Sequence, residues 1–145
     1  MFLFLKTLNS LRLYKKEKLC SLTAIDMLFT RREGNVCTSF PLRAVWRIND
    51  KRTNKNAQFL ASIPKKRFKH AVDRVKLHRR VREAYRLNRQ HLSCDENIAL
   101  DIAFIYIGSS IVKYDEIEKA MIKLLQKVSN ALNSPEKETN YEKGV

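Results

Sequence analysis

Residues 71–92 read AVDRVKLHRRVREAYRLNRQHL and combine regular apolar spacing with many basic side chains. Apolar side chains recur along this stretch at spacings of 4, 3, 1 and 7 residues: Leu77, Val81, Ala84, Tyr85 and Leu92. At 100° per residue they share one face, which predicts an amphipathic helix packed on a core. Residues 57–63, before this helix, have the composition of a strand.

A second strand is predicted after the helix, in residues 98–107 (IALDIAFIYI). This run is nearly all apolar and rich in β-branched and aromatic residues, as expected for a strand buried on both faces. Only Asp101 interrupts it, so we expect that carboxylate to find a partner or to lie at the edge of the core.

The remaining segments complete an α+β pattern. A short helix is predicted over 21–29, capped by Ser21 or Thr23, and strands over 36–48, where Pro41 fits an edge or a strand break. Residues 49–56 are polar and are most simply a hairpin loop, and 114–132 form an amphipathic core-packing helix. The order α-β-β-β-α-β-α predicts a two-layer sandwich with helices on one side of a small, mostly antiparallel sheet.

One domain is expected, over residues 11–132, because a chain of 145 residues suits a single core. Residues 1–10 are interpreted as an N-terminal extension, and the polar residues 133–145 as a disordered tail. The apolar run at the start ends at Lys6, too short for a membrane span and unlike a signal peptide, so we expect a cytoplasmic protein. Three cysteines without metal-ligand spacing predict free thiols and no metal site: Cys20, Cys37 and Cys94.

Charge is the outlying feature of the composition. Lys and Arg total 29 against 15 Asp and Glu, a net charge of +14, which a polyanionic partner would offset. Residues 65–89 hold eleven basic and two acidic side chains, so most of the excess lies there. A solvated basic surface without a partner is the less favoured alternative.

Four arginines of this region are predicted to form a stripe along one side of the helix, within an arc of about 80°: Arg79, Arg82, Arg86 and Arg89. Arginines on successive turns repel one another by about 0.2–0.5 kcal/mol per pair. A phosphate backbone makes such a row favourable, because guanidinium groups bind phosphates bidentately. The stripe therefore indicates a nucleic-acid contact, with a merely solubilising face as the alternative.

No catalytic set is recognisable in the sequence. A phosphate-binding glycine loop, a nucleophile–histidine pair and a dense carboxylate cluster are all missing from its patterns. His78 and His91 adjoin the basic helix as acid–base candidates, although RNA contacts or surface positions suit them better. If the chain takes part in a reaction, we expect another molecule to carry the chemistry.

Residues 71–86 (AVDRVKLHRRVREAYR) resemble the central helix of the bacterial ribonuclease P protein family, whose pattern is approximately A-V-x-R-N-R-x-K-R-x-x-R-E-x-[FY]-R. Pro64-Lys65-Lys66 resembles the family's Ser-Lys-Lys, and Leu13-Tyr14-Lys15-Lys16 with Leu28-Phe29 resembles its first-helix region. The helix containing Tyr114 fits as well, so the resemblance covers residues 11–132. Departures from the pattern include Val75 in place of an Asn, Lys76 in place of the Arg that follows it, and Ile25 in place of an aromatic residue.

The resemblance implies that the partner is the catalytic RNA of ribonuclease P. Together they remove the 5′ leader of precursor tRNA by hydrolysing one phosphodiester bond. It implies that the RNA, and not the protein, holds catalytic magnesium, and that neither DNA nor a membrane is a partner. The family fold also implies a left-handed β-α-β crossover, which periodicity alone does not predict.

Site residues follow from the resemblance together with the charge pattern. RNA binding is expected at the basic residues Lys65, Lys66, Arg67, Arg74, Lys76, Arg79, Arg80, Arg82, Arg86 and Arg89. The leader cleft is expected at Ile25, Phe29, Arg43 and Ser62, with Phe29 as a platform for base stacking. Catalytic and metal-binding residues are not expected in the protein.

Two other functions suit a small basic α+β domain. A ribosomal or other structured-RNA-binding protein without a reaction fits the composition equally well, but not the pattern at residues 71–86. A DNA-binding regulator with 71–92 as its recognition helix is disfavoured, because a strand and not a short helix precedes it.

Overall fold

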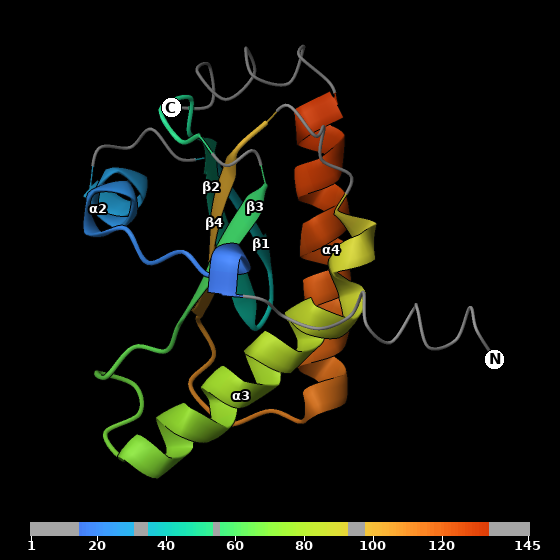
Figure 1. Cartoon of the computed structure of the whole chain (residues 1–145). Coiled ribbons are helices and arrows are strands. Elements are labelled where there is room, and N and C mark those ends of the chain that lie inside the picture. The colour runs from blue at the N-terminus through green and yellow to red at the C-terminus, as the bar shows by residue number, and fades with distance from the viewer. Residues whose placement is uncertain (1–14, 31–34, 54–55, 93–97, 134–145) are drawn as a thin grey trace, which may run out of the picture.

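A computed structural model describes residues 15–29, 35–53, 56–92 and 98–133, together with the backbone of Thr30 (Figure 1). Its elements are η1 (Lys15–Glu17), α2 (Leu22–Thr30), β1 (Asn35–Ser39), β2 (Leu42–Ile48), β3 (Ala57–Ser62), α3 (Ala71–Asn88), η2 (Arg89–His91), β4 (Leu100–Tyr106) and α4 (Tyr114–Asn133). The helices and strands lie where the periodicity predicts them. The N-terminal extension 1–10 and residues 134–145 of the predicted tail lie outside the described residues, whereas Asn133, which was expected in the tail, ends α4.

The four strands form one mixed sheet in the order β1-β2-β4-β3. β1 pairs with β2 and β2 with β4 in antiparallel fashion, whereas β3 runs parallel to β4. The predicted hairpin between β2 and β3 is therefore wrong, since β4 lies between them. The reason is burial: β4 is the most apolar strand, and between β2 and β3 both of its edges are paired while the cores on either side of the sheet cover both of its faces.

The parallel pair β3 and β4 is joined through α3, which makes a β-α-β unit. This is the unit that the family resemblance implies to be left-handed. Parallel neighbours need such a crossover, because a tight turn can join only antiparallel strands. The crossover places α3 beside the edge strand β3.

Asp101 is fully buried in β4 and finds its partners in the segment after β2. Its carboxylate pairs with the guanidinium of Arg52 and accepts a hydrogen bond of 3.0 Å from Asn49 Nδ2. Arg52 also donates to the carbonyl of Leu100 at 3.1 Å. The polar segment expected to be a hairpin loop thus neutralises the one charged group of the central strand.

The two faces of the sheet carry different helices (Figure 1). α3 and α4 cover the main core, in which Trp46, Phe104 and Tyr106 are buried. α2 lies on the opposite face, where Leu28 packs against Val45 of β2 and Ala103 of β4. The α+β class is confirmed, but the expectation that the helices share one side fails for α2. On this second face β2 and β4 contribute the apolar side chains of Val45, Ala103 and Ile105, and α2 covers them.

The start of α2 is set locally by the predicted cap. The backbone N–H of Ala24 donates to Ser21 Oγ at 3.3 Å, the N-cap bond three residues into the helix. No helix among the described residues is long and apolar enough to cross a membrane.

Candidate nucleic-acid interface

α3 is anchored in the core along one side. Leu77, Val81 and Ala84 are fully buried, and the ring of Tyr85 stacks on Phe59 of β3 with centroids 4.2 Å apart. These are the apolar positions that the periodicity predicts. Their burial fixes the rotation of the helix, so the basic residues on its other sides are held toward solvent.

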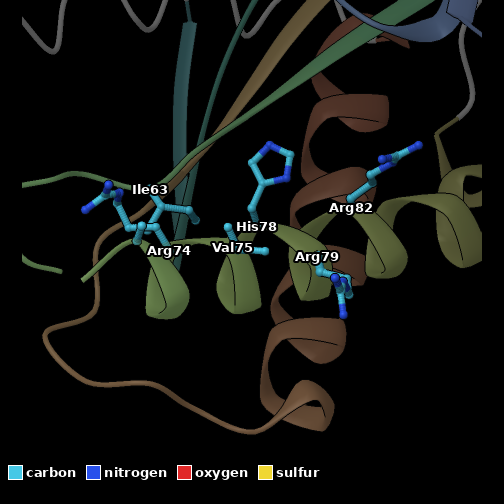
Figure 2. A pocket seen from close by; sticks show the side chains of 7 residues that line it. Ile63, Arg74, Val75, His78, Arg79 and Arg82 are labelled. Carbon is cyan, nitrogen blue, oxygen red and sulfur yellow. The ribbon is translucent and has the colours of Figure 1, made fainter. Parts of the chain in front are cut away.

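A basic groove runs along the first half of α3, beside the end of β3 (Figure 2). It has a volume of about 460 Å³ and is lined by Ile63, Ala71, Arg74, Val75, His78, Arg79 and Arg82. In Figure 2, His78 and Arg82 point to the strand side of α3 and Arg79 to the other side. The groove therefore has three arginines and several apolar side chains in its lining, a composition suited to phosphates.

His78 sits at the junction of two hollows. Besides the basic groove, it lines a smaller hollow of about 210 Å³ together with Arg82 and residues 18–20 and 59–61. Burial, followed by the charge of Arg82, lowers the pKa of His78 below its usual value of 6.5. The imidazole is therefore neutral near pH 7, and a phosphate placed nearby would favour its protonated form.

Arg74 also fixes the loop that enters α3. Its Nη1 donates to the carbonyl oxygens of Phe68 at 2.8 Å and Lys69 at 2.9 Å. These bonds hold the guanidinium over the start of the helix, where it lines the groove. Val75 replaces the family's Asn in the floor of the groove, with its side chain exposed.

The predicted four-arginine stripe divides into two halves. Arg79 and Arg82 are exposed in the groove. Arg86 pairs with Glu83 one turn earlier, and this contact raises the pKa of Arg86 and lowers that of Glu83. The exposed positive charge of the stripe thus lies at Arg79 and Arg82, because Glu83 offsets the charge of Arg86.

Arg89 is held by Glu17, 72 residues away in the sequence. Its Nη1 donates to both carboxylate oxygens at 2.7 Å, and the two side chains are only 15% and 18% exposed. A helical projection cannot reveal this partner, because Glu17 comes from the N-terminal segment. Arg89 ties that segment to the end of α3.

The other predicted basic residues lie elsewhere around α3. Lys76 is exposed, and Arg80 donates to the carbonyl of Val112 at 2.7 Å. Lys65 and Lys66 are exposed in the turn before α3. Arg67 follows them and donates to the carbonyl of Ile107 at 2.7 Å. The ten predicted residues therefore do not form a single surface.

The four residues predicted for the leader cleft belong to the α2 side of the sheet. Phe29 is 41% exposed and lies one turn after Ile25, which packs against the small core under α2. Arg43 and Ser62 both pair with Ile105 of β4, so they lie in one row across the sheet. Ile105 packs against the same small core, which places this row on the α2 face.

Sequence patterns missed a polar pocket on this face, at the first turn of α2. It has a volume of about 280 Å³ and includes Arg47, Lys51, Arg52, Gln58 and Asp101 in its lining. The basic residues come from β2 and the segment after it, where the sequence shows no dense run of charge. Only the buried position of Asp101 in a strand hinted that cations would gather here.

Cys20 and Cys37 are free thiols, as predicted, and Cys94 lies outside the described residues. Burial raises the pKa of Cys37 to about 11 despite the nearby charge of Lys127, so its thiol is protonated. Within the described part of the chain, His, Cys, Asp and Glu side chains do not gather in threes that could hold a metal ion.

Comparison with known proteins gives one family. The sequence profile of the Ribonuclease P family matches residues 13–129. The chain is 34% identical over 125 residues to the ribonuclease P protein component of Porphyromonas gingivalis, covering 84% of this chain and 90% of the relative. It is 33% identical over 133 residues to the ribonuclease P protein component of Chlorobium phaeobacteroides, and the match covers 83% of this chain and 88% of that relative.

Solved structures show the same fold. The RNase P protein from Thermotoga maritima superposes with a TM-score of 0.60 at 22% identity, over 77% of this chain and 96% of that one. The RNase P protein from Staphylococcus aureus superposes with a TM-score of 0.61 at 16% identity, over 80% of this chain and 97% of that one. The chain belongs to the ribonuclease P protein family.

Proposed function

We propose that this chain is the protein subunit of ribonuclease P and acts in the cytoplasm. In this proposal, α3 and the turn before it bind the catalytic RNA, and the α2 side of the sheet holds the 5′ leader of precursor tRNA. The RNA, with its magnesium ions, carries out hydrolysis of the phosphodiester bond. Family membership supports the assignment, and the positions of the basic and aromatic side chains support the division of roles.

The basic groove is the observation that carries the RNA-binding role. Arg74, Arg79 and Arg82 line a hollow of about 460 Å³, and an apolar side of the same helix is fixed in the core. The guanidinium fork matches phosphate geometry, and the helix that carries it is already fixed in the core, so binding orders little additional backbone. A partner RNA would also relieve the repulsion within a chain of net charge +14.

The leader role rests on Phe29 and on the row of the sheet beside α2. An aromatic ring that is 41% exposed offers a stacking surface to a base of any sequence. Arg43 is exposed on the same face of the sheet, where it could meet leader phosphates. Ile25 adds apolar contact but no ring, so we assign the stacking to Phe29.

The protein's part in the reaction is binding and orientation. Magnesium bound by the RNA supplies the metal-assisted hydrolysis. His78 lines the basic groove with three arginines, so we assign it a phosphate contact and no proton transfer. His91 accepts a hydrogen bond from Ser129 Oγ at its backbone carbonyl, so its backbone helps join η2 to α4.

The most discriminating test is to purify the protein from cells and to sequence the nucleic acid bound to it. We expect one stable RNA of the ribonuclease P type, together with precursor tRNAs. Enrichment of ribosomal RNA would instead indicate a ribosomal role, and enrichment of DNA a regulator. Arg82→Ala serves as the matched variant, since it should reduce recovery of the cognate RNA without unfolding the protein.

A further inference from the structure

A second surface lies at the end of the sheet where β4 leads into α4. Residues 107–113 (IGSSIVK) form the connection, called here loop 107–113. The backbone N–H of Ile107 donates to the carbonyl of Pro41 at 2.8 Å, so the loop lies against the turn between β1 and β2. Segments from two distant parts of the sequence therefore meet here.

Loop 107–113 is held in place from both ends. Arg67 donates to the carbonyl of Ile107, and Arg80 donates to the carbonyl of Val112, each at 2.7 Å. Within the loop, the Tyr106 hydroxyl donates to the carbonyl of Ser110 and accepts from the N–H of Val112 at 3.2 Å. The surface is therefore preorganised, and binding to it orders little extra chain.

Two large apolar side chains are exposed on this fixed surface. Phe40, in the turn beside Pro41, is 68% exposed, and Ile111 of the loop is 37% exposed. A single exposed aromatic residue is common on protein surfaces. Phe40 differs because its neighbour Pro41 accepts a hydrogen bond from Ile107, which keeps the backbone of the turn in place beside loop 107–113.

The surroundings of this surface are basic. The turn before α3, residues 64–70 (PKKRFKH), and loop 107–113 together contain Lys65, Lys66, Arg67, Lys69 and Lys113 and no acidic residue. The first acidic residues beyond the loop, Asp115 and Glu116, begin α4. The charge suits a polyanion, and the ring suits an unpaired base.

We propose that Phe40 and loop 107–113 form a second RNA-docking surface, on which an unpaired base of the catalytic RNA stacks against the Phe40 ring. Arg67 and Lys113 face the neighbouring phosphates. The surface is separate from the basic groove, whose lining does not include Phe40. The inference rests on the proposed function and extends it by naming a further contact.

An RNA base fits this surface better than a protein partner does. Among the described residues of the two segments, the large exposed apolar side chains are Phe40 and Ile111. A stable protein interface buries a total of about 1,200–2,000 Å², much of it apolar at the centre. One ring and one aliphatic side chain in a basic setting match a stacked base with its phosphates.

The test compares three substitutions of Phe40 in the full chain, with affinity for the catalytic RNA as the readout. Phe40→Ala should weaken binding about 5- to 150-fold, the range that 1–3 kcal/mol of stacking gives at 1.4 kcal/mol per tenfold. Phe40→Tyr should bind like the unchanged protein, and Phe40→Leu should resemble Phe40→Ala. Ile48→Ala is the matched control, since Ile48 is exposed at the opposite end of β2.

The slope of affinity against salt should be the same for Phe40→Ala as for the unchanged protein, because no phosphate contact is removed. Equal RNA affinity of Phe40→Ala and the unchanged protein would overturn the inference. Full RNA affinity of Phe40→Leu would also overturn the inference. Leu has no aromatic ring, so such a result would mean that apolar contact, and not stacking, holds the RNA. Failure of the proposed function looks different: the unchanged protein would then bind ribonuclease P RNA no better than an unrelated RNA.

Discussion

Replacing Phe29 by Ala separates leader binding from folding. A fully buried Phe contributes about 1.5–3 kcal/mol through its burial. Because Phe29 keeps 41% of its surface exposed, its removal should lower the free energy of unfolding by about 1–2 kcal/mol. Phe59→Ala is the matched control: Phe59 is buried and stacked on Tyr85, so its loss should cost about 3–5 kcal/mol.

The binding effect of Phe29→Ala should depend on the leader. Loss of one stacked base should weaken the reconstituted complex's affinity for precursor tRNA by about 1–3 kcal/mol. Affinity for mature tRNA, which has no leader, should hardly change. The assay is therefore the ratio of precursor to mature affinity, measured for the unchanged protein and the variant. If the folded variant keeps that ratio, Phe29 does not contact the leader and the assignment of the α2 face is refuted.

Three further predictions concern α3 and Arg89, which follows it. Arg82→Ala should reduce the slope of log affinity for the catalytic RNA against log salt by up to about 1, with little change in melting temperature; an unchanged slope with a large drop in melting temperature would make Arg82 structural. Arg89→Ala should lower the free energy of unfolding by about 1.5–3 kcal/mol, since it removes a charged pair with Glu17, and should leave the salt slope unchanged; a reduced slope would return Arg89 to the RNA contacts. RNA affinity should rise as pH falls below 6.5 toward the depressed pKa of free His78, because bound phosphate favours the protonated imidazole; the same measurement on His78→Gln should show little of that rise.

The pKa of His78 also makes a prediction about stability in the free protein. Its folded-state pKa lies below 6.5, so the folded state binds fewer protons than the unfolded chain. The stabilising effect of neutral His78 is therefore complete above 6.5 and is lost as pH falls toward the depressed pKa. Chemical unfolding at several pH values should show this loss in the free protein and not in His78→Gln.

Local patterns predicted the elements of the fold but not all of their neighbours. The apolar face of α3 and the buried run of β4 follow from side-chain spacing, which depends on adjacent residues alone. The order β1-β2-β4-β3 depends on which strand gains most from an interior place, a comparison across the whole chain. The position of α2 on the second face likewise depends on Val45 and Ala103, which local periodicity assigns to no helix.

The sequence predicts where the basic region lies, but it does not predict which of its arginines pair with carboxylates. Exposed Arg79 and Arg82 lie together in the groove, as the helical projection indicates. Arg89 does not join them, because Glu17 arrives from far away in the sequence. The surface around Phe40 had no sequence signal either, since its parts meet only through hydrogen bonds between the β1–β2 turn and loop 107–113.

Cleavage of precursor tRNA by separated and combined components tests whether the RNA carries the chemistry and the protein assists it. The protein alone, the catalytic RNA alone and both together are each given magnesium and one labelled precursor. We expect no cleavage by the protein alone, and a single cut at the leader junction by the combined components, faster than by the RNA alone under the same conditions. Robust cleavage by RNA-free protein, or no effect of the protein on the RNA's reaction, would contradict the proposed division of roles.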